Sequence, residues 1–137
     1  MKWQTRQKGP KLRIGAGSAW WGDRIEPAQW NAERGDLDFL CFETMAEATV
    51  SAAQVRARRD PGFPGYDSYL DDRLRAVLPG CIAHGTRIVS NQGWINPDGA
   101  AEHCVKLLQE LGCQIGRATS ELQSPYVISY AVFCLKK

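Results

Sequence analysis

Leu12-Arg-Ile-Gly-Ala-Gly-Ser18, followed at Gly22-Asp-Arg-Ile-Glu-Pro27 by the start of a helix, is the stretch of sequence that decides the fold. A short apolar run breaks here into glycines and polar residues, which is the pattern of a strand-to-helix connection in α/β proteins. Two later predicted strands also end in polar residues, Glu43-Thr44 and Asn91-Gln-Gly93. Because ligands of α/β folds bind at the carboxyl ends of parallel strands, we expect a small-molecule site where these ends meet.

The spacing of apolar residues predicts strands that alternate with helices. The strands are expected over 12–16, 37–42 and 87–90, and the helices over 27–34, 44–59, 70–84 and 97–111. Such units form a parallel sheet through right-handed crossovers. The predicted fold class is therefore α/β, a parallel β-sheet of βα units that is either doubly wound or part of a barrel. A complete barrel needs about 250 residues, and this chain has 137.

Local patterns sharpen these predictions. The strand over 37–42 is almost continuously apolar, as in strands buried on both faces of a sheet. Thr44-Met-Ala-Glu47 has the sequence of a capping box at a helix start. Pro79 lies within a helical pattern that it is expected to kink or shorten, because it lacks an amide donor. The segment 126–135 has the composition of a strand, but its place in the fold stays open. The buried stripe expected for the last helix is Ala101, Cys104, Val105, Leu108 and Leu111.

Composition and charge exclude several classes of protein. With 44% hydrophobic and 23% charged residues, the chain has the content of one globular domain. Residues 1–11 are basic and predicted to be a flexible lead-in, not a nucleic-acid surface. No apolar run reaches the roughly 20 residues of a membrane span, so the expected location is the cytoplasm, with a mitochondrial import segment as the alternative. The 5 cysteines lack metal-ligand spacing, so neither disulfides nor a metal site are predicted, and the cofactor is unknown.

Gly15 and Gly17 are the first candidates for ligand binding. In a dinucleotide fingerprint, such glycines let the backbone approach a pyrophosphate at a helix N-terminus. The third glycine would stand at position 20, which is Trp20, and the helix starts only near Pro27. Nucleotide binding, a structural turn and another small ligand therefore all stay open.

Charged and amide side chains also follow the predicted strands. Asp23 and Arg24 lie in the first loop, where they either orient a polar substrate or form a surface ion pair. Glu43 stands at a helix start, where the helix dipole stabilises a carboxylate that can bind a hydroxyl group. The predicted catalytic residues are Glu43 and Asp23, and the predicted ligand-binding residues are Gly15, Gly17, Arg24, Asn91 and Gly93.

Trp20, Trp21 and Trp94 lie in loops that follow the first and third strands. Aromatic rings at these places either cover an apolar ligand or cover the edge of the core. His84 and His103 lie within helices away from the strand ends and are predicted to be structural. A hydrolase with a Ser-His-Asp or Cys-His arrangement is therefore not expected.

Several blocks of this sequence together are similar to one protein family. The blocks are Gly15-Ala-Gly-Ser18, Gly22-Asp-Arg-Ile-Glu-Pro-Ala28, Ala32-Glu-Arg-Gly-Asp-Leu-Asp38, Phe42-Glu43, Gly65-Tyr-Asp67, Arg73-Leu-Arg-Ala-Val-Leu-Pro79, Asn91-Gln-Gly93 and Asn96-Pro97. Over residues 12–112 they resemble the N-terminal domain of the acyclic terpene utilisation (AtuA-like) family. The resemblance implies a part in the breakdown of terpenoids such as citronellol and geraniol, with a terpenoid or acyl-CoA type of ligand. It does not imply a particular reaction, so whether the chain is an enzyme stays open.

The chain departs from the family's pattern in two places. Trp20-Trp21 stand where the family tends to have smaller residues or one phenylalanine, which reshapes the first loop. The likeness ends after Gly112, so residues 113–137 are predicted to be a tail foreign to a truncated domain. Two rival functions stay open: a non-catalytic interaction domain whose sheet edge needs a second copy or a partner subunit, and a nucleotide-dependent oxidoreductase fragment.

Overall fold

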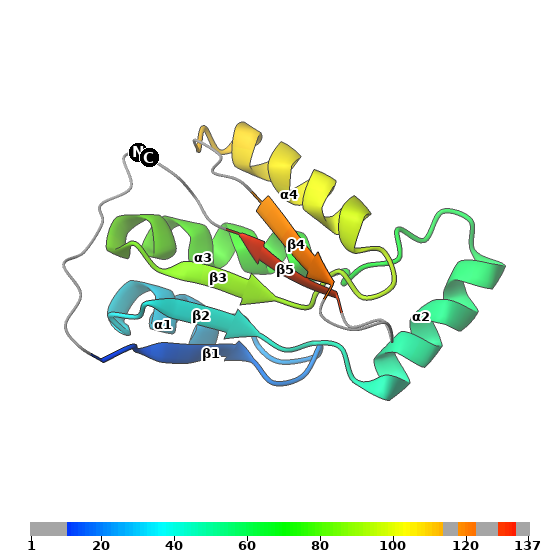
Figure 1. The fold of residues 1–137 in the computed structure, drawn as a ribbon, viewed down its shortest axis with the longest axis horizontal. Helices are drawn as coiled ribbons and strands as arrows, with labels where there is room; N and C mark the ends of the chain where they lie inside the picture. The colour runs from blue at the N-terminus through cyan, green and yellow to red at the C-terminus, as the bar shows by residue number, and fades with distance from the viewer. Residues whose placement is uncertain (1–10, 114–117, 123–128, 134–137) are drawn as a thin grey trace.

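The computed structural model describes residues 11–113, 118–122 and 129–133, which form an α/β fold around a five-stranded sheet (Figure 1). The elements are β1 (Ile14–Ser18), α1 (Glu26–Arg34), β2 (Phe39–Phe42), α2 (Glu47–Arg59), α3 (Leu70–His84), β3 (Arg87–Ser90), α4 (Pro97–Glu110), β4 (Ala118–Leu122) and β5 (Ser129–Phe133). The predicted alternation of strands and helices is confirmed from β1 to α4. None of the four described helices combines the length and the apolar content that crossing a membrane needs.

Three parallel strands form the part of the sheet that carries the predicted site. The strand order is β1-β2-β3-β5-β4, in which β1, β2 and β3 are parallel and β5 is antiparallel to both of its neighbours. Ser18 pairs with Phe42, and Phe42 pairs with Ser90, so the carboxyl ends of the three strands lie side by side. We call the loops at this end, residues 19–25, 43–46 and 91–96, the rim. The predicted α/β class is confirmed, and the sheet is open, not a closed barrel.

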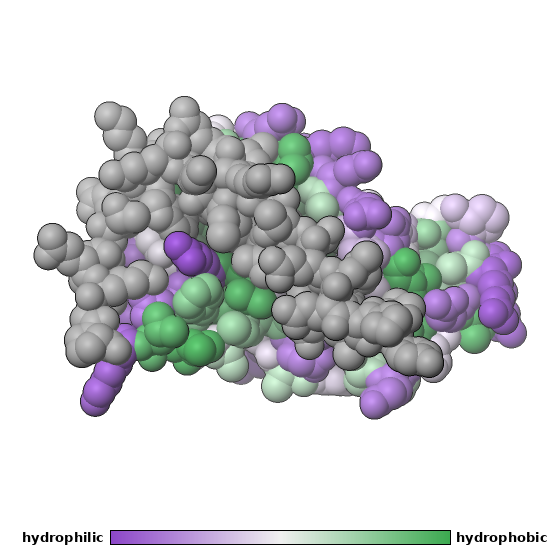
Figure 2. Space-filling view, viewed as in Figure 1, coloured by the Kyte–Doolittle hydropathy of each residue, from purple (hydrophilic) through white to green (hydrophobic). Residues whose placement is uncertain are grey.

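The hydrophobic core lies on one face of this sheet. In β2, Leu40 and Phe42 are buried, whereas the alternate residues Phe39 and Cys41 are partly exposed. Figure 1 shows α1 and α3 behind the strands, and buried residues of α1, α3 and α4 form one cluster with β2 and β3. On the opposite face, hydrophobic side chains gather over β1 and β2 (Figure 2). The prediction that the second strand is buried on both faces is therefore wrong, because the described helices that build the core pack on one face only.

The helix α2 stands beyond the rim and projects away from the sheet (Figure 1). The predicted capping box at its start is wrong: the N-cap residue is Ala46, which makes no side-chain capping bond. Thr44 is buried instead, and its hydroxyl accepts a hydrogen bond from Trp94 Nε1 at 3.1 Å. The Thr44 hydroxyl, which the local pattern predicts to cap the helix, is thus bound by Trp94, 50 residues away along the chain.

The predictions for α3, α4 and the last segment have mixed outcomes. The helix α3 runs through Pro79 without ending there, so of the two effects expected of Pro79 the shortening is wrong and the kink stays a prediction. Asn96 caps α4 as expected, since its side chain accepts a hydrogen bond from the backbone amide of Gly99. The buried residues of α4 are Ala100, Cys104, Leu107 and Leu108, a face rotated from the predicted stripe, and Leu111 is exposed. The strand β5 lies within the segment 126–135, as its composition indicates, whereas β4 has no counterpart in the sequence prediction.

The helices α1 and α3 are in close contact at Gly80, where a Cβ atom would lie 2.8 Å from the backbone carbonyl carbon of Ala32. Gly80→Ala is therefore expected to lower the free energy of unfolding by about 1–3 kcal/mol, because the added methyl group meets backbone that cannot yield cheaply. Urea denaturation followed by circular dichroism measures the change. Gly62→Ala adds the same group in an exposed turn and should change stability by less than about 0.5 kcal/mol. Equal losses in both variants would contradict this account of the packing.

Candidate functional site

Glu43 and Asn91, predicted from different strands, are in contact at the rim. Asn91 Nδ2 donates a hydrogen bond to Glu43 Oε1 at 2.9 Å, and Asn91 Oδ1 accepts one from the backbone amide of Thr44 at 2.8 Å. Glu43 Oε1 also accepts a hydrogen bond from the amide of Met45 at 2.8 Å. Asn91 is buried and Glu43 is exposed. The arrangement holds a carboxylate in a fixed position at the surface of the rim.

The first strand joins this pair through the backbone. Ser18 Oγ donates to the carbonyl oxygen of Glu43 at 2.9 Å, and the amide of Glu43 donates to the carbonyl oxygen of Ser18 at 3.1 Å. The amide of Asn91 in turn reaches the carbonyl oxygen of Phe42 at 3.4 Å. The ends of β1, β2 and β3 are thus tied together at the rim, as the parallel pattern of the sequence predicts.

A buried ion pair that the sequence analysis missed lies next to these strand ends. Arg73 Nη1 donates to Asp67 Oδ2 at 2.5 Å, and the two side chains are 1% and 0% exposed. Arg73 Nη2 donates to the backbone carbonyl of Trp21 in the first rim loop. Gln92 Nε2 donates to Asp67 Oδ2 at 3.2 Å, and Asp67 Oδ1 accepts from the amide of Tyr69. The network joins two rim loops to α3 and to the loop before it.

A sequence signal for this pair was present in the helix pattern. Arg73 lies three residues after Leu70 and four before Val77, and apolar residues at spacings of three and four indicate the buried face of a helix. A charged residue at such a position needs a buried partner. Its partner Asp67 lies in a segment rich in turn residues, which hid its role.

Asp23 shapes the first rim loop. Its Oδ2 accepts hydrogen bonds from the backbone amides of Ala19 at 2.7 Å and Trp20 at 3.0 Å. The loop presents Trp20 and Trp21 with their ring centroids 5.4 Å apart, and Trp21 stacks on Tyr69 at 6.0 Å. The carboxylate predicted to be catalytic thus binds the backbone of the loop that carries the two tryptophans.

The side chain of Arg24 binds Glu26 at the start of α1. It forms an exposed ion pair with Glu26 at 3.1 Å, and this hydrogen bond raises the pKa of Arg24 and lowers that of Glu26. Such an exposed pair matches the surface alternative that the sequence left open for Arg24.

The three predicted ligand-binding glycines are all in close packing contacts. A Cβ atom at Gly17 would lie 2.6 Å from the ring of Phe42, and one at Gly15 would collide with Leu37. A Cβ atom at Gly93 would lie 2.7 Å from the Cα atom of Pro97. Neighbouring side chains or backbone thus crowd the space beside each of these glycines.

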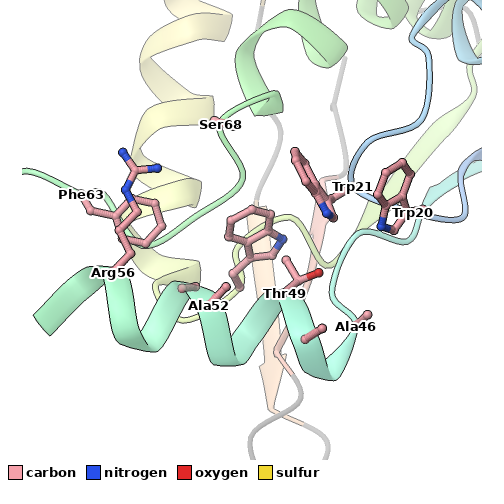
Figure 3. Close-up of a pocket in the computed structure, with 11 residues that line it drawn as sticks. Trp20, Trp21, Ala46, Thr49, Ala52, Arg56, Phe63 and Ser68 are labelled. Carbon is pink, nitrogen blue, oxygen red and sulfur yellow. The ribbon is translucent and has the colours of Figure 1, made fainter. Parts of the chain in front are cut away.

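A pocket of about 320 Å³ lies between α2 and the rim. Figure 3 shows Trp20 and Trp21 at one end of the pocket, Arg56 and Phe63 at the other, and α2 along its floor. The residues that line it are Trp20, Trp21, Ala46, Ala48, Thr49, Ala52, Ala53, Arg56, Phe63, Ser68 and Trp94. The three tryptophans singled out in the sequence therefore all line one cavity, and the small side chains of α2 leave room for it.

Trp94, in the wall of the pocket, has a strained backbone conformation. Its φ angle is 42°, in the left-handed region that a bulky residue rarely adopts. Two bonds hold it there: its amide donates to the carbonyl oxygen of Asn91 at 3.3 Å, and its indole Nε1 donates to Thr44 Oγ1 at 3.1 Å. Strained residues of this kind cluster at functional sites. The same bonds connect the pocket to the Glu43–Asn91 pair through Thr44.

The predicted site residues thus divide into groups. Glu43 and Asn91 come together at the rim, Asp23 supports the first loop, and Arg24 is paired with Glu26. None of the seven residues lines the pocket, and their functional roles stay predictions. In the part of the chain that the structure describes, no three His, Cys, Asp or Glu side chains gather as metal ligands.

Comparison with known proteins identifies a family that covers the rim and the pocket. The family model described as "Acyclic terpene utilisation family protein AtuA" matches residues 12–120. No curated protein and no solved structure matches the chain significantly. The matched range contains the rim, α2 and every residue that lines the pocket. The domain boundary expected at residue 112 stays a prediction.

Asn91→Asp is expected to destabilise the fold at pH 7 by roughly 1 kcal/mol, because a second carboxylate replaces the amide that donates to Glu43. Like charges raise the pKa of one carboxyl group, so stability lost at pH 7 should return as the pH falls below about 5. Urea denaturation at several pH values measures this. The double variant Glu43→Gln with Asn91→Asp is the control, and full pH dependence in it would show that Glu43 is not the partner.

Proposed function

The chain belongs to the acyclic terpene utilisation (AtuA) family, and from this premise we propose that it binds a small apolar ligand of the acyclic terpenoid type in the pocket between α2 and the rim. The wall of the pocket carries the proposal. Three tryptophans, a phenylalanine and four alanines line it, so a hydrocarbon chain would meet apolar surface on most sides. Aromatic walls with a few polar groups are typical of small-molecule sites.

The size of the pocket supports a small ligand. Its volume of about 320 Å³ lies at the lower end of the range of about 300–1,000 Å³ for small-molecule sites. Apolar surface removed from water contributes about 25 cal/mol per Å², so even a ligand without polar groups gains affinity here. A branched hydrocarbon chain fits such a wall because branching adds apolar surface without adding length.

The proposal concerns binding and assigns no reaction. Glu43 is the candidate for chemistry on a polar group of the ligand, because its carboxylate is exposed and held by Asn91 and Met45. Asp23 is proposed to act through the loop that it supports. The cytoplasmic location, the absence of a nucleic-acid partner and the truncation of the domain stay predictions of the sequence.

The rival of a nucleotide-dependent oxidoreductase has less support. The fingerprint glycines of that class leave room for a pyrophosphate. In this chain Leu37 fills the space beside Gly15 and Phe42 fills the space beside Gly17. Moreover, α1 begins only at Glu26, well after the glycines.

Ala52→Phe is expected to abolish binding of citronellol, because the new ring occupies the pocket from its floor. Calorimetric titration of the whole chain measures the affinity. Ala57→Phe is the matched control: it makes the same exchange at an exposed position of α2 outside the pocket lining. Both variants should keep the wild-type stability within about 0.5 kcal/mol. If Ala52→Phe binds citronellol as wild type does, the pocket is not the site.

A second candidate function is self-association along β1. This strand is at one edge of the described sheet, and Leu12 and Ile14 are 67% and 65% exposed. An exposed apolar edge strand can pair with another chain. This observation favours a second copy as the partner that would cover the sheet edge.

Sedimentation velocity over a range of concentrations tests this second candidate. The wild-type chain is expected to dimerise, and Ile14→Lys should weaken the dimer because a charge on the edge opposes strand pairing. Val55→Lys, at an exposed valine of α2, is the control and should leave association unchanged. A wild-type chain that stays monomeric at all concentrations would rule out this function.

A further inference from the structure

We propose that Arg56 binds the anionic end of the ligand, so that the pocket selects an apolar chain with one negatively charged head group over its neutral counterpart. This inference rests on the proposed ligand pocket and adds to it the class of ligand and the direction in which the ligand lies. The charged head would lie at Arg56 and the hydrocarbon chain would extend toward Trp20 and Trp21.

The pocket has two chemically different ends. Trp20 and Trp21 form an aromatic end, and Arg56 and Phe63 form the other (Figure 3). The guanidinium carbon of Arg56 lies 4.5 Å from the ring centroid of Phe63, so the arginine is held against an aromatic face. An amphipathic ligand therefore has a preferred orientation along the pocket.

The charge of the pocket favours an anion. Among the described residues that line it, Arg56 is the only charged one, and no carboxylate faces the cavity. A guanidinium binds a carboxylate or phosphate by paired hydrogen bonds with a geometry that an alcohol cannot reproduce.

The present partner of Arg56 leaves room for a ligand. Arg56 Nε lies 3.5 Å from Asp60 Oδ2, and the two side chains are 59% and 47% exposed. An exposed pair at this distance is weak because water screens it. A guanidinium has five N–H donors, and the contact with Asp60 involves Nε. Asp60 therefore acts as a weak competitor that a better-placed anion can outbind.

A matched pair of probes tests the inference: citronellic acid, ionised at pH 7, and citronellol, which has the same carbon skeleton and no charge. Calorimetric titrations use the whole chain at low ionic strength. Arg56→Gln is expected to weaken binding of the acid about tenfold and to leave binding of the alcohol unchanged. Arg58→Gln is the control for a general positive field and should leave both affinities within about twofold, because Arg58 does not line the pocket.

Asp60→Asn gives a gain of affinity that misfolding cannot imitate. It removes the charge that competes for Arg56 and keeps an oxygen to accept the hydrogen bond from the amide of Gly62. Binding of the acid should become about threefold to tenfold tighter, with the alcohol unchanged.

Each outcome separates this inference from the function on which it rests. If the alcohol binds but Arg56→Gln leaves the affinity of the acid unaltered, the role of Arg56 is wrong and the pocket is still the binding site. If Arg56→Gln and Arg58→Gln weaken the acid equally, a diffuse field binds the anion and the inference also falls. If neither probe binds to the wild-type chain, the proposed function fails together with the inference.

Discussion

The buried ion pair between Asp67 and Arg73 is the interaction on which the geometry of the site depends. Two charges taken out of water are tolerated only when hydrogen bonds satisfy their remaining donors and acceptors. Here Trp21, Tyr69 and Gln92 supply those bonds from separate segments, and no buried side-chain nitrogen or oxygen of the described residues lacks a partner. The charges therefore stay buried only while the first rim loop, the start of α3 and the end of β3 keep their relative positions. Removal of either partner would leave the other charge buried and unpaired, which is costlier than the loss of the pair.

This constraint fixes the tryptophan-lined wall of the pocket, which faces α2 across the cavity. Trp21 is held by its carbonyl bond to Arg73 and by stacking on Tyr69, and Trp94 is held by Thr44. The floor is α2, whose two buried residues, Thr49 and Ala53, both line the pocket. The buried side of α2 thus lines the pocket, and no residue of α2 belongs to the core cluster. A ligand in the pocket would extend the contact between α2 and the rim.

The sequence predicted features that depend on local periodicity and missed those that depend on distant partners. The alternation of strands and helices placed Glu43 and Asn91 at adjacent strand ends, because parallel strands leave their carboxyl ends on the same side. The capping box failed because Asn91 and Trp94 bind Thr44 from 47 and 50 residues away. The one-sided burial of β2 was not predictable from its composition, since an apolar strand does not reveal which layers pack on it. Arg73 was overlooked because an apolar stripe was sought and its charged member was disregarded.

Glu43 lies outside the pocket lining, and this limits what it can do. Its carboxylate is already oriented by two donors, so it needs no rearrangement to meet a polar group, which is the property that makes a fixed charge effective in a site. Yet it does not line the pocket, and the link between them runs through Thr44 and Trp94. A ligand seated with its head at Arg56 and its chain toward Trp20 and Trp21 would have its apolar end nearest this side of the rim. Glu43 would then contact the ligand only if the hydrocarbon chain carried a second polar group near that end. The position of such a group therefore decides whether binding leads to chemistry.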